Sequence, residues 1–250
     1  MRTTLRNVLR SALLIPGFFL LTISLAGVVL VLAHRDPDDA RIERILQWWS
    51  DRFLRLPPVD YELHGVDRID PTRRYVFVSN HLSNFDIPLL LRGIPVRIRF
   101  LAKAELYRIP LFGRAMDRVG VVKIDRTRAT SAHQAINRAA REVLGRGYSL
   151  IVFPEGTRSR SGDMLPFKKG AFRIAIDNEV PIVPVVLCGT HDVYPPGAWT
   201  FRPGRASLTI LEPVETVGMD VDDLEPLLEK VRAEMVAHYE EQRTRGCVQS

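Results

Sequence analysis

The chain has 250 residues, of which 46% are hydrophobic and 26% charged, so it suits one substantial folded domain with an appendage. Its formal net charge of +6 suits an anionic membrane surface or phosphorylated ligands as partners. Nucleic acid is not an expected partner, because the sequence has neither a zinc-finger spacing nor an RNA-binding signature. The two cysteines, Cys188 and Cys247, do not suggest a disulfide framework and indicate a reducing, cytosolic setting.

The first expected element is a long apolar helix. The run from Ser11 to Ala33 carries no charged side chain and, as a helix, would be about 34 Å long, enough to cross a bilayer. Arginines flank both ends and Pro16-Gly17 could kink the run, so a re-entrant segment and a span with the C-terminal body in the cytosol both fit. A signal peptide is a third interpretation, which the long apolar core and the basic far flank disfavour.

A second, amphipathic helix follows. Its apolar residues recur at helical spacing, Trp48 adjoins them, and arginines occupy the polar positions. The apolar set is Ile42, Ile45, Leu46, Trp49, Phe53 and Leu56. This pattern is typical of a helix at a membrane interface, and a helix packed on the domain is the alternative. Pro57-Pro58 end the helix, so we place a domain boundary there, with membrane-associated helices in residues 1–57 and the second domain in residues 58–250.

The body of the chain alternates strand-like apolar runs with helical patterns. This alternation predicts an α/β domain in which helices flank a sheet. The expected strands cover residues 74–79, 96–101, 120–124, 150–153, 182–187 and 206–211. The expected helices begin near residue 83 and cover 131–144, 167–178 and a C-terminal segment around 224–235.

A histidine and an aspartate stand five residues apart in Asn80-His81-Leu82-Ser83-Asn84-Phe85-Asp86, directly after an expected strand. On a continuous helix they would be turned roughly 140° apart, so they can meet only across a strand-to-helix turn. A carboxylate on one ring nitrogen would fix the tautomer of a histidine that acts as a general base. Helix capping is the alternative role for Asp86, and a hydrogen-bonded core position is the alternative for His81. The same spacing at His34 and Asp39 follows no strand, and we interpret that pair as a solvated helix entry.

A second polar motif, Phe153-Pro154-Glu155-Gly156-Thr157-Arg158-Ser159, also follows an expected strand. Its backbone N–H groups, the Thr157 hydroxyl and the Arg158 guanidinium could bind a phosphate, while an ordinary turn with a surface salt bridge is the alternative. The sequence has no Gly-x-Ser-x-Gly elbow, no Walker loop and no metal-ligand spacing. Direct attack by an activated substrate hydroxyl is therefore the simplest scheme.

Four blocks in order resemble the glycerolipid acyltransferase family, in particular the 1-acylglycerol-3-phosphate acyltransferases. They lie at residues 80–86, 103–126, 153–159 and 180–185, and the resemblance covers roughly residues 60–215 without a departure at a motif position. It implies an α/β fold with a mixed sheet flanked by helices and an N-terminal membrane-associated segment. It also implies that His81 deprotonates the sn-2 hydroxyl of lysophosphatidic acid, which attacks an acyl thioester and gives phosphatidic acid, while Asp86 orients His81 and stabilises its protonated form.

The resemblance also implies a set of substrate-binding residues: Lys103, Arg126, Glu155, Gly156, Thr157 and Arg158. The cations would hold the acceptor phosphate, and Glu155 with Gly156 would shape the pocket. Pro181 to Val185 would form part of the acyl-binding wall or, equally, of the core. No metal and no bound organic cofactor is implied.

The partners implied by the resemblance are membrane lipids, the lysophospholipid acceptor, and acyl-CoA or acyl-carrier protein as donor. The expected location is the cytoplasmic membrane, with the catalytic domain facing the cytosol. Two alternatives remain open at this point. One is transfer to another lysolipid, such as lyso-ornithine lipid. The other is a non-catalytic lipid-binding protein, which the intact His81 and Asp86 disfavour.

Overall fold

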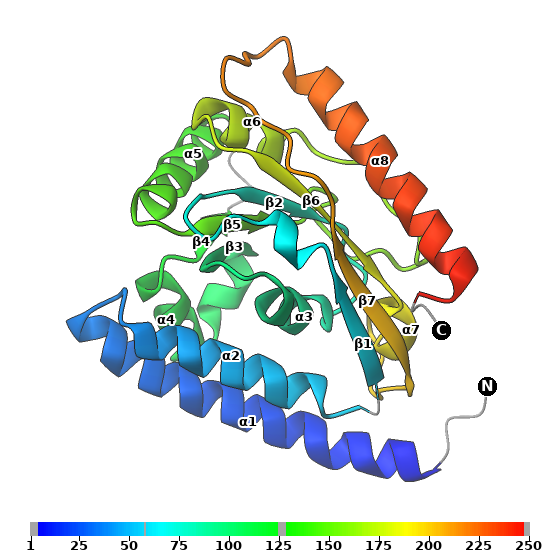
Figure 1. Ribbon diagram of the computed structural model, residues 1–250. Coiled ribbons are helices and arrows are strands. Elements are labelled where there is room, and N and C mark those ends of the chain that lie inside the picture. The colour runs from blue at the N-terminus through cyan, green and yellow to red at the C-terminus, as the bar shows by residue number, and fades with distance from the viewer. Residues whose placement is uncertain (1–4, 58, 125–128, 248–250) are drawn as a thin grey trace.

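The computed structural model describes residues 5–57, 59–124 and 129–247, in which seven strands form one sheet (Figure 1). The strands are β1 Val59–His64, β2 Val76–Ser79, β3 Ile98–Lys103, β4 Val122–Ile124, β5 Ser149–Val152, β6 Ile182–Cys188 and β7 Gly204–Ile210. Their order across the sheet is β1-β7-β6-β2-β5-β3-β4. Neighbours are parallel except β6 and β7, which are antiparallel, so the sheet is mixed and the expected fold class is confirmed.

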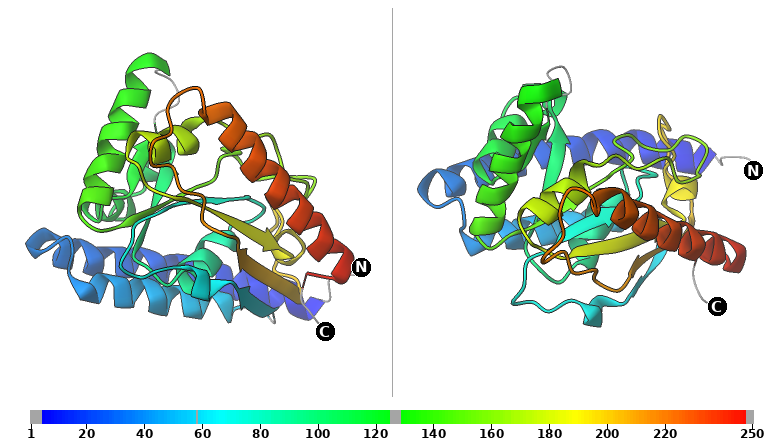
Figure 2. Two further views of the ribbon diagram at one scale, coloured as in Figure 1. Left: turned by 45° about the horizontal axis from the view of Figure 1, so that its top comes forward. Right: turned by 90° about the horizontal axis from the view of Figure 1, so that it is seen from above.

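Helices cover both faces of this sheet (Figures 1 and 2). They are α1 Leu5–Arg35, α2 Ala40–Leu54, α3 Asp86–Gly93, α4 Phe112–Arg118, α5 Ala129–Gly145, α6 Gly170–Asp177, α7 Thr190–Val193 and α8 Leu224–Arg245, with 3-10 helices η1 Val66–Arg68 and η2 Ala104–Arg108. The central strand β2 joins two cores, because side chains alternate across a strand. Val76 and Val78 face the core under α5, α6 and α8, whereas Tyr75 and Phe77 face the core under α2 and α3.

The apolar stripe of α2 packs against the rest of the protein. The alternative of a helix packed on the domain therefore holds for the residues of this stripe. The centroid of the Phe53 ring lies 5.0 Å from that of Phe18, 5.9 Å from that of Phe85 and 5.8 Å from that of Phe201. These partners come from α1, the turn before α3 and a loop near residue 200, which are distant in sequence and could not be read from the periodicity of α2. Trp48 remains on the outer side and is 45% exposed.

Helix α1 follows the protein surface along its apolar run. Near its start, the backbone N–H of Phe201 donates to Ser11 Oγ over 3.2 Å, and near its end Ala33 packs in one cluster with Ala115 and Val119 of α4 and its C-terminal end. The outward side carries exposed apolar residues, which are Leu13, Phe19, Leu20, Val28 and Val31. Within the described residues, this is one helix long and apolar enough to cross a membrane.

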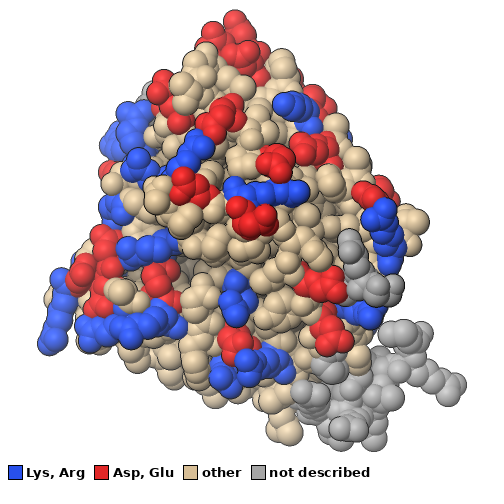
Figure 3. All heavy atoms as spheres, in the orientation of Figure 1, with Lys and Arg blue, Asp and Glu red and all other residues tan. Residues whose placement is uncertain are grey.

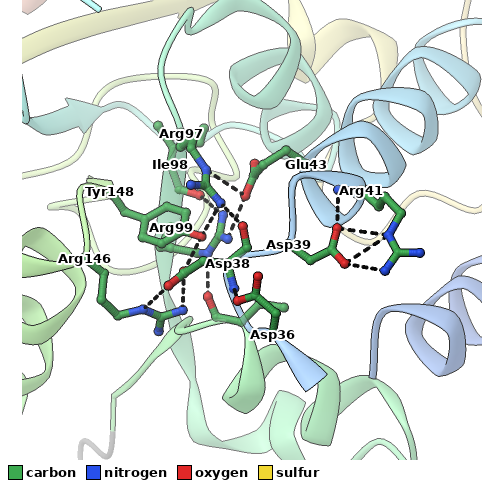
Figure 4. A network of polar contacts seen from close by, with 11 residues as sticks. Asp36, Asp38, Asp39, Arg41, Glu43, Arg97, Ile98, Arg99, Arg146 and Tyr148 are labelled. Carbon is green, nitrogen blue, oxygen red and sulfur yellow. Dashed lines mark hydrogen bonds and ion pairs between the residues drawn. The ribbon is translucent and has the colours of Figure 1, made fainter. Parts of the chain in front are cut away.

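A polar network ties the turn between α1 and α2 to the sheet (Figure 4). Asp38 Oδ1 accepts from Arg146 Nη2 at 2.6 Å and from the Tyr148 hydroxyl at 2.7 Å. The buried Arg99 donates to Glu43 of α2 at 2.7 Å and lies 3.9 Å from the centre of the Tyr148 ring. The network joins the two sides of the expected boundary, which falls between the end of α2 and the start of β1; the division into two domains stays a prediction.

The structure joins Cys188 and Cys247 in a disulfide, so the expectation of unpaired cysteines is wrong. Cys188 ends the fully buried strand β6. Helix α8 ends at Gly246, whose φ of 89° is in the left-handed region that glycine tolerates, and this turn brings Cys247 back to the end of β6. The cytosolic setting therefore loses the support that it drew from the cysteines.

Replacing Cys247 by serine is expected to lower the free energy of unfolding by about 2–4 kcal/mol under oxidising conditions, because the disulfide closes a long loop. The two cysteines are 59 positions apart in sequence. Thermal unfolding with and without dithiothreitol checks this: wild type should lose the same stability on reduction, and the variant should be insensitive. A wild type that is itself insensitive to reduction would contradict the bond's contribution.

Candidate active site

His81 and Asp86 meet across the turn between β2 and α3, as the spacing predicts. His81 Nδ1 lies 2.8 Å from Asp86 Oδ2, and the carboxylate is fully buried. The same oxygen accepts the backbone N–H groups of Leu82 at 2.7 Å and Ser83 at 2.8 Å. Asp86 therefore orients the histidine and also holds the turn that starts α3, as a capping role predicts, while its catalytic role stays a prediction. The other ring nitrogen of His81, Nε2, is left for a substrate in the adjoining cleft.

Neighbouring residues fix the position of the His81 ring. The Asn80 side chain exchanges two hydrogen bonds with the backbone of Leu187 on β6, at 2.8 and 2.9 Å. The Phe153 ring stacks on the imidazole with a centroid distance of 3.9 Å and an interplanar angle of 14°. The ring can thus present Nε2 in one orientation, which a general base requires.

Glu155 links its own motif to the histidine motif by hydrogen bonds and does not line the cleft. Its Oε1 accepts the backbone N–H of His81 and its Oε2 that of Leu165, both at 2.8 Å, and the carboxyl is buried and does not line the cleft. Burial raises its pKa to about 7, although both backbone donors favour the charged form; the charge of Asp86 raises the pKa further. The sequence cannot show this role, because both donors are backbone groups.

Replacing Glu155 by glutamine is expected to remove one component of the pH dependence of stability. Since the pKa in the folded state, about 7, exceeds the unfolded value near 4.5, the folded protein binds the extra proton between these pH values. The stabilisation is complete below pH 4.5 and is lost as the pH rises through 7, by up to about 3 kcal/mol. Unfolding by urea from pH 4.5 to 8 should therefore show a flatter profile for Glu155→Gln than for wild type.

The control for this experiment is Glu229→Gln, on the exposed side of α8, which should keep the wild-type profile. Equal slopes for wild type and Glu155→Gln would show that Glu155 keeps the same protonation state on folding.

A cleft of about 1390 Å³ opens beside His81. Its polar lining includes Lys103 at the end of β3, Gly156, Arg158 and Asn84. Arg158 Nη1 donates to Asn84 Oδ1 at 2.9 Å, which links the phosphate-binding motif to the histidine motif. The rest of the wall is largely apolar, with Ile87, Phe100, Leu101, Leu106, Val152 and Phe153. Cations beside a histidine and an apolar wall suit an anionic lipid substrate.

The expected substrate-binding residues divide into three groups. Lys103, Gly156 and Arg158 line the cleft, whereas Glu155 and Thr157 do not. Arg126 lies outside the described residues. The acyl-wall segment, residues 181–185, is buried in and just before β6 and belongs to the core, which was its alternative role.

The sequence interpretation did not select Asn84, Lys168 or Lys169, which also line the cleft. Asn84 lies within the histidine motif, and that position was its only signal. The adjacent lysines read in the sequence as an ordinary solvent-facing charge run, and the ion pair of Lys169 with Glu225 joins segments that are distant in sequence. Among the described residues, no group of three or more His, Cys, Asp or Glu side chains could hold a metal ion.

The His81–Asp86 pair, the cation-lined cleft and the mixed α/β sheet are the arrangement expected of an enzyme that transfers a group to a substrate hydroxyl. A family model described as Acyltransferase matches residues 60–188, and the chain belongs to this family of acyltransferases.

The relatives have one activity in their names. The chain is 35% identical over 231 residues to the 1-acyl-sn-glycerol-3-phosphate acyltransferase alpha of Mus musculus, which covers 92% of this chain and 80% of that protein. It is 37% identical over 180 residues to the 1-acyl-sn-glycerol-3-phosphate acyltransferase of Saccharomyces cerevisiae, 71% of this chain and 59% of that protein. The crystal structure of the 1-acyl-sn-glycerophosphate (LPA) acyltransferase PlsC from Thermotoga maritima matches with a TM-score of 0.82 at 33% identity, over 96% of this chain and 97% of that one.

Proposed function

We propose that this acyltransferase moves the acyl group of a thioester to the sn-2 hydroxyl of 1-acylglycerol 3-phosphate and so makes phosphatidic acid. The observation that carries the proposal is the dyad. His81 is held by Asp86 through Nδ1 and borders a cleft that Lys103 and Arg158 also line. The names of the relatives and of the matching crystal structure support the same substrate.

The chemistry is a single transfer. Nε2 of His81 takes the hydroxyl proton while the hydroxyl oxygen attacks the thioester carbonyl carbon. The new C–O ester bond forms, the C–S bond breaks, and the leaving thiolate takes the proton from His81, which returns to its neutral form. Asp86 stabilises the imidazolium between these events. The donor is acyl-CoA or acyl-carrier protein, and the scheme calls for no metal or bound organic cofactor, which remains a prediction.

Arg158→Gln is expected to lower kcat/KM for a phosphate-bearing acceptor about 10- to 100-fold, because a charge-assisted hydrogen bond to phosphate is lost. Kinetics with lysophosphatidic acid and with lyso-ornithine lipid check this, and only the first should suffer. Arg160→Gln is the matched control, since Arg160 is exposed two residues further on and does not line the cleft. An equal loss of kcat/KM with both acceptors would show that Arg158 does not recognise the phosphate.

The enzyme is proposed to act at the cytoplasmic membrane with its cleft open to the cytosol. The body packs on α1 near both Ser11 and Ala33, so a helix crossing the bilayer would carry part of the body into it. This arrangement supports a helix that lies in one leaflet. Trp199, 87% exposed on the loop beside the start of α1, adds an aromatic side chain typical of the interface.

Thiol release from an acyl donor by the detergent-purified chain tests the reaction, with lysophosphatidic acid, lyso-ornithine lipid and glycerol 3-phosphate as separate acceptors. Release with lysophosphatidic acid alone is expected. Release only with lyso-ornithine lipid would overturn the acceptor and keep the mechanism. No thiol release with any of the three acceptors, tested with both acyl-CoA and acyl-carrier protein as donors, would overturn the proposed reaction.

A further inference from the structure

A second hollow, separate from the cleft, lies between the C-terminal end of α1 and α4. Its volume is about 530 Å³, a size typical of small-molecule sites. Leu30 and Val31 form its apolar part. The remaining lining is charged or titratable: His34, Arg35, Arg114, Asp117 and Arg118. None of these residues lines the cleft beside His81.

The hollow has an excess of positive charge. Its three arginines face one carboxylate, Asp117, and none of the three has an ion pair or a side-chain hydrogen bond within the described ranges. Of the acidic residues of the α1–α2 turn, Asp38 binds Arg146 and Asp39 binds Arg41, whereas Asp36 accepts the backbone N–H of Asp38 (Figure 4). Unpaired arginines around a concave surface are an arrangement suited to a phosphate group.

The position of the hollow indicates where that phosphate comes from. Arg35 comes two residues after the uncharged run of α1, whose outer side exposes Val28 and Val31. In the space-filling view, Lys and Arg side chains lie over the α1–α2 turn with Asp and Glu side chains interspersed among them (Figure 3). Apolar surface that ends in a basic hollow matches the boundary between acyl chains and headgroups.

We propose that this hollow binds the phosphate group of an anionic phospholipid headgroup, as a lipid site distinct from the active site. The proposal rests on the membrane association proposed above but not on acyl transfer. Helix α4 packs tightly on η2, since a Cβ added at Gly113 would lie 2.3 Å from the carbonyl oxygen of Tyr107. As Leu106 of η2 lines the cleft, a lipid bound in the hollow would hold one wall of the cleft at the membrane surface.

Vesicle co-sedimentation of the full chain tests the proposal, with phosphatidylcholine vesicles and with vesicles that also contain phosphatidylglycerol. Arg118→Glu should weaken binding to the anionic vesicles about 25-fold, and Asp117→Asn should strengthen it about fivefold. The matched control is Lys230→Glu on α8, where the effect should be under about twofold because α8 lies across the sheet from α4 (Figure 1) and salt screens distant charges.

A second measurement separates the site from general membrane attachment. Binding of soluble dihexanoyl phosphatidylglycerol to the detergent-purified chain should be lost in Arg118→Glu and retained in Arg158→Gln, since the latter residue belongs to the cleft. This binding needs neither a membrane nor turnover, so a failure of the proposed reaction leaves the result interpretable.

Three results would overturn the proposal. Equal losses of vesicle binding in Arg118→Glu and Lys230→Glu would mean that the net charge of the protein, and not a site in the hollow, attracts it to anionic lipid. Competition by inorganic phosphate at the same concentration as the lipid would assign the hollow to free phosphate. Lower thermal stability of Arg118→Glu with unchanged lipid binding would mean that the arginines only offset the C-terminal ends of α1 and α4.

Discussion

Replacing His81 by alanine is expected to lower kcat by at least about 10²–10⁴-fold, the usual contribution of a positioned general base. The KM for the acceptor should change little, because Lys103 and Arg158 are the residues proposed to hold the phosphate. The fold should persist, since Asp86 keeps the backbone N–H groups of Leu82 and Ser83 as donors. Single-turnover thiol release, with the donor that the wild type uses, measures the effect.

Added imidazole should restore part of the activity of this variant, because the cavity left by the ring adjoins the cleft. The matched control is His64→Ala on the edge strand β1, where the histidine is 3.1 Å from Glu62 and away from the cleft. His81→Ala with near-wild-type kcat would remove the base from the mechanism.

Asp86→Asn is expected to lower kcat roughly 10²–10⁴-fold with little change in stability. The asparagine oxygen can occupy the place of Oδ2 and accept from His81, Leu82 and Ser83, while its amide takes the place of Oδ1, which has no partner among the described residues. What is lost is the charge that stabilises the imidazolium during the transfer, and a 10²–10⁴-fold loss in kcat corresponds to about 3–5 kcal/mol in the activation barrier. Thermal unfolding and turnover of the same preparation measure the two quantities.

Asp86→Ala supplies the contrast. It removes the acceptor from every one of these donors, each costing about 1–3 kcal/mol when buried, so it should lose stability as well as turnover. If Asp86→Asn kept wild-type turnover, Asp86 would serve only to hold the turn before α3.

Local patterns were enough to predict the dyad and the layered fold. A spacing of five residues from histidine to aspartate means that the two cannot meet on one helix, and the apolar run before Asn80 supplies the strand that the turn needs. Helices α5 and α8 and strand β6 could also be predicted. Burial of one helix face gives a periodic apolar pattern, and burial of a strand on both faces gives a continuous apolar run.

The remaining features depend on contacts between distant segments. Strand β1 is half-exposed at the sheet edge, so Val59–His64 lacks a strong apolar signal. The apolar periodicity of α2 is the same whether its apolar side contacts lipid or protein, so the contact of Phe53 with Phe85 could not be predicted from it. Glu155 looked like a substrate ligand because its partners are backbone groups, and the disulfide depends on a left-handed turn at the end of α8.

The buried guanidinium of Arg99 has a consequence for any attempt to obtain a soluble catalytic body by truncation. Its charged partner, Glu43, comes from α2, and Arg99 is only 2% exposed in the intact chain. A chain that begins at residue 58 would keep this cation and lose its anion, in addition to exposing the apolar surface beneath α2. A guanidinium that stayed buried without its anion would cost about 3–5 kcal/mol, a large share of the stability of an ordinary domain. Solubility would therefore require a neutral residue in place of Arg99 as well as a repaired surface, so the two N-terminal helices are structural parts of the enzyme and not a detachable anchor.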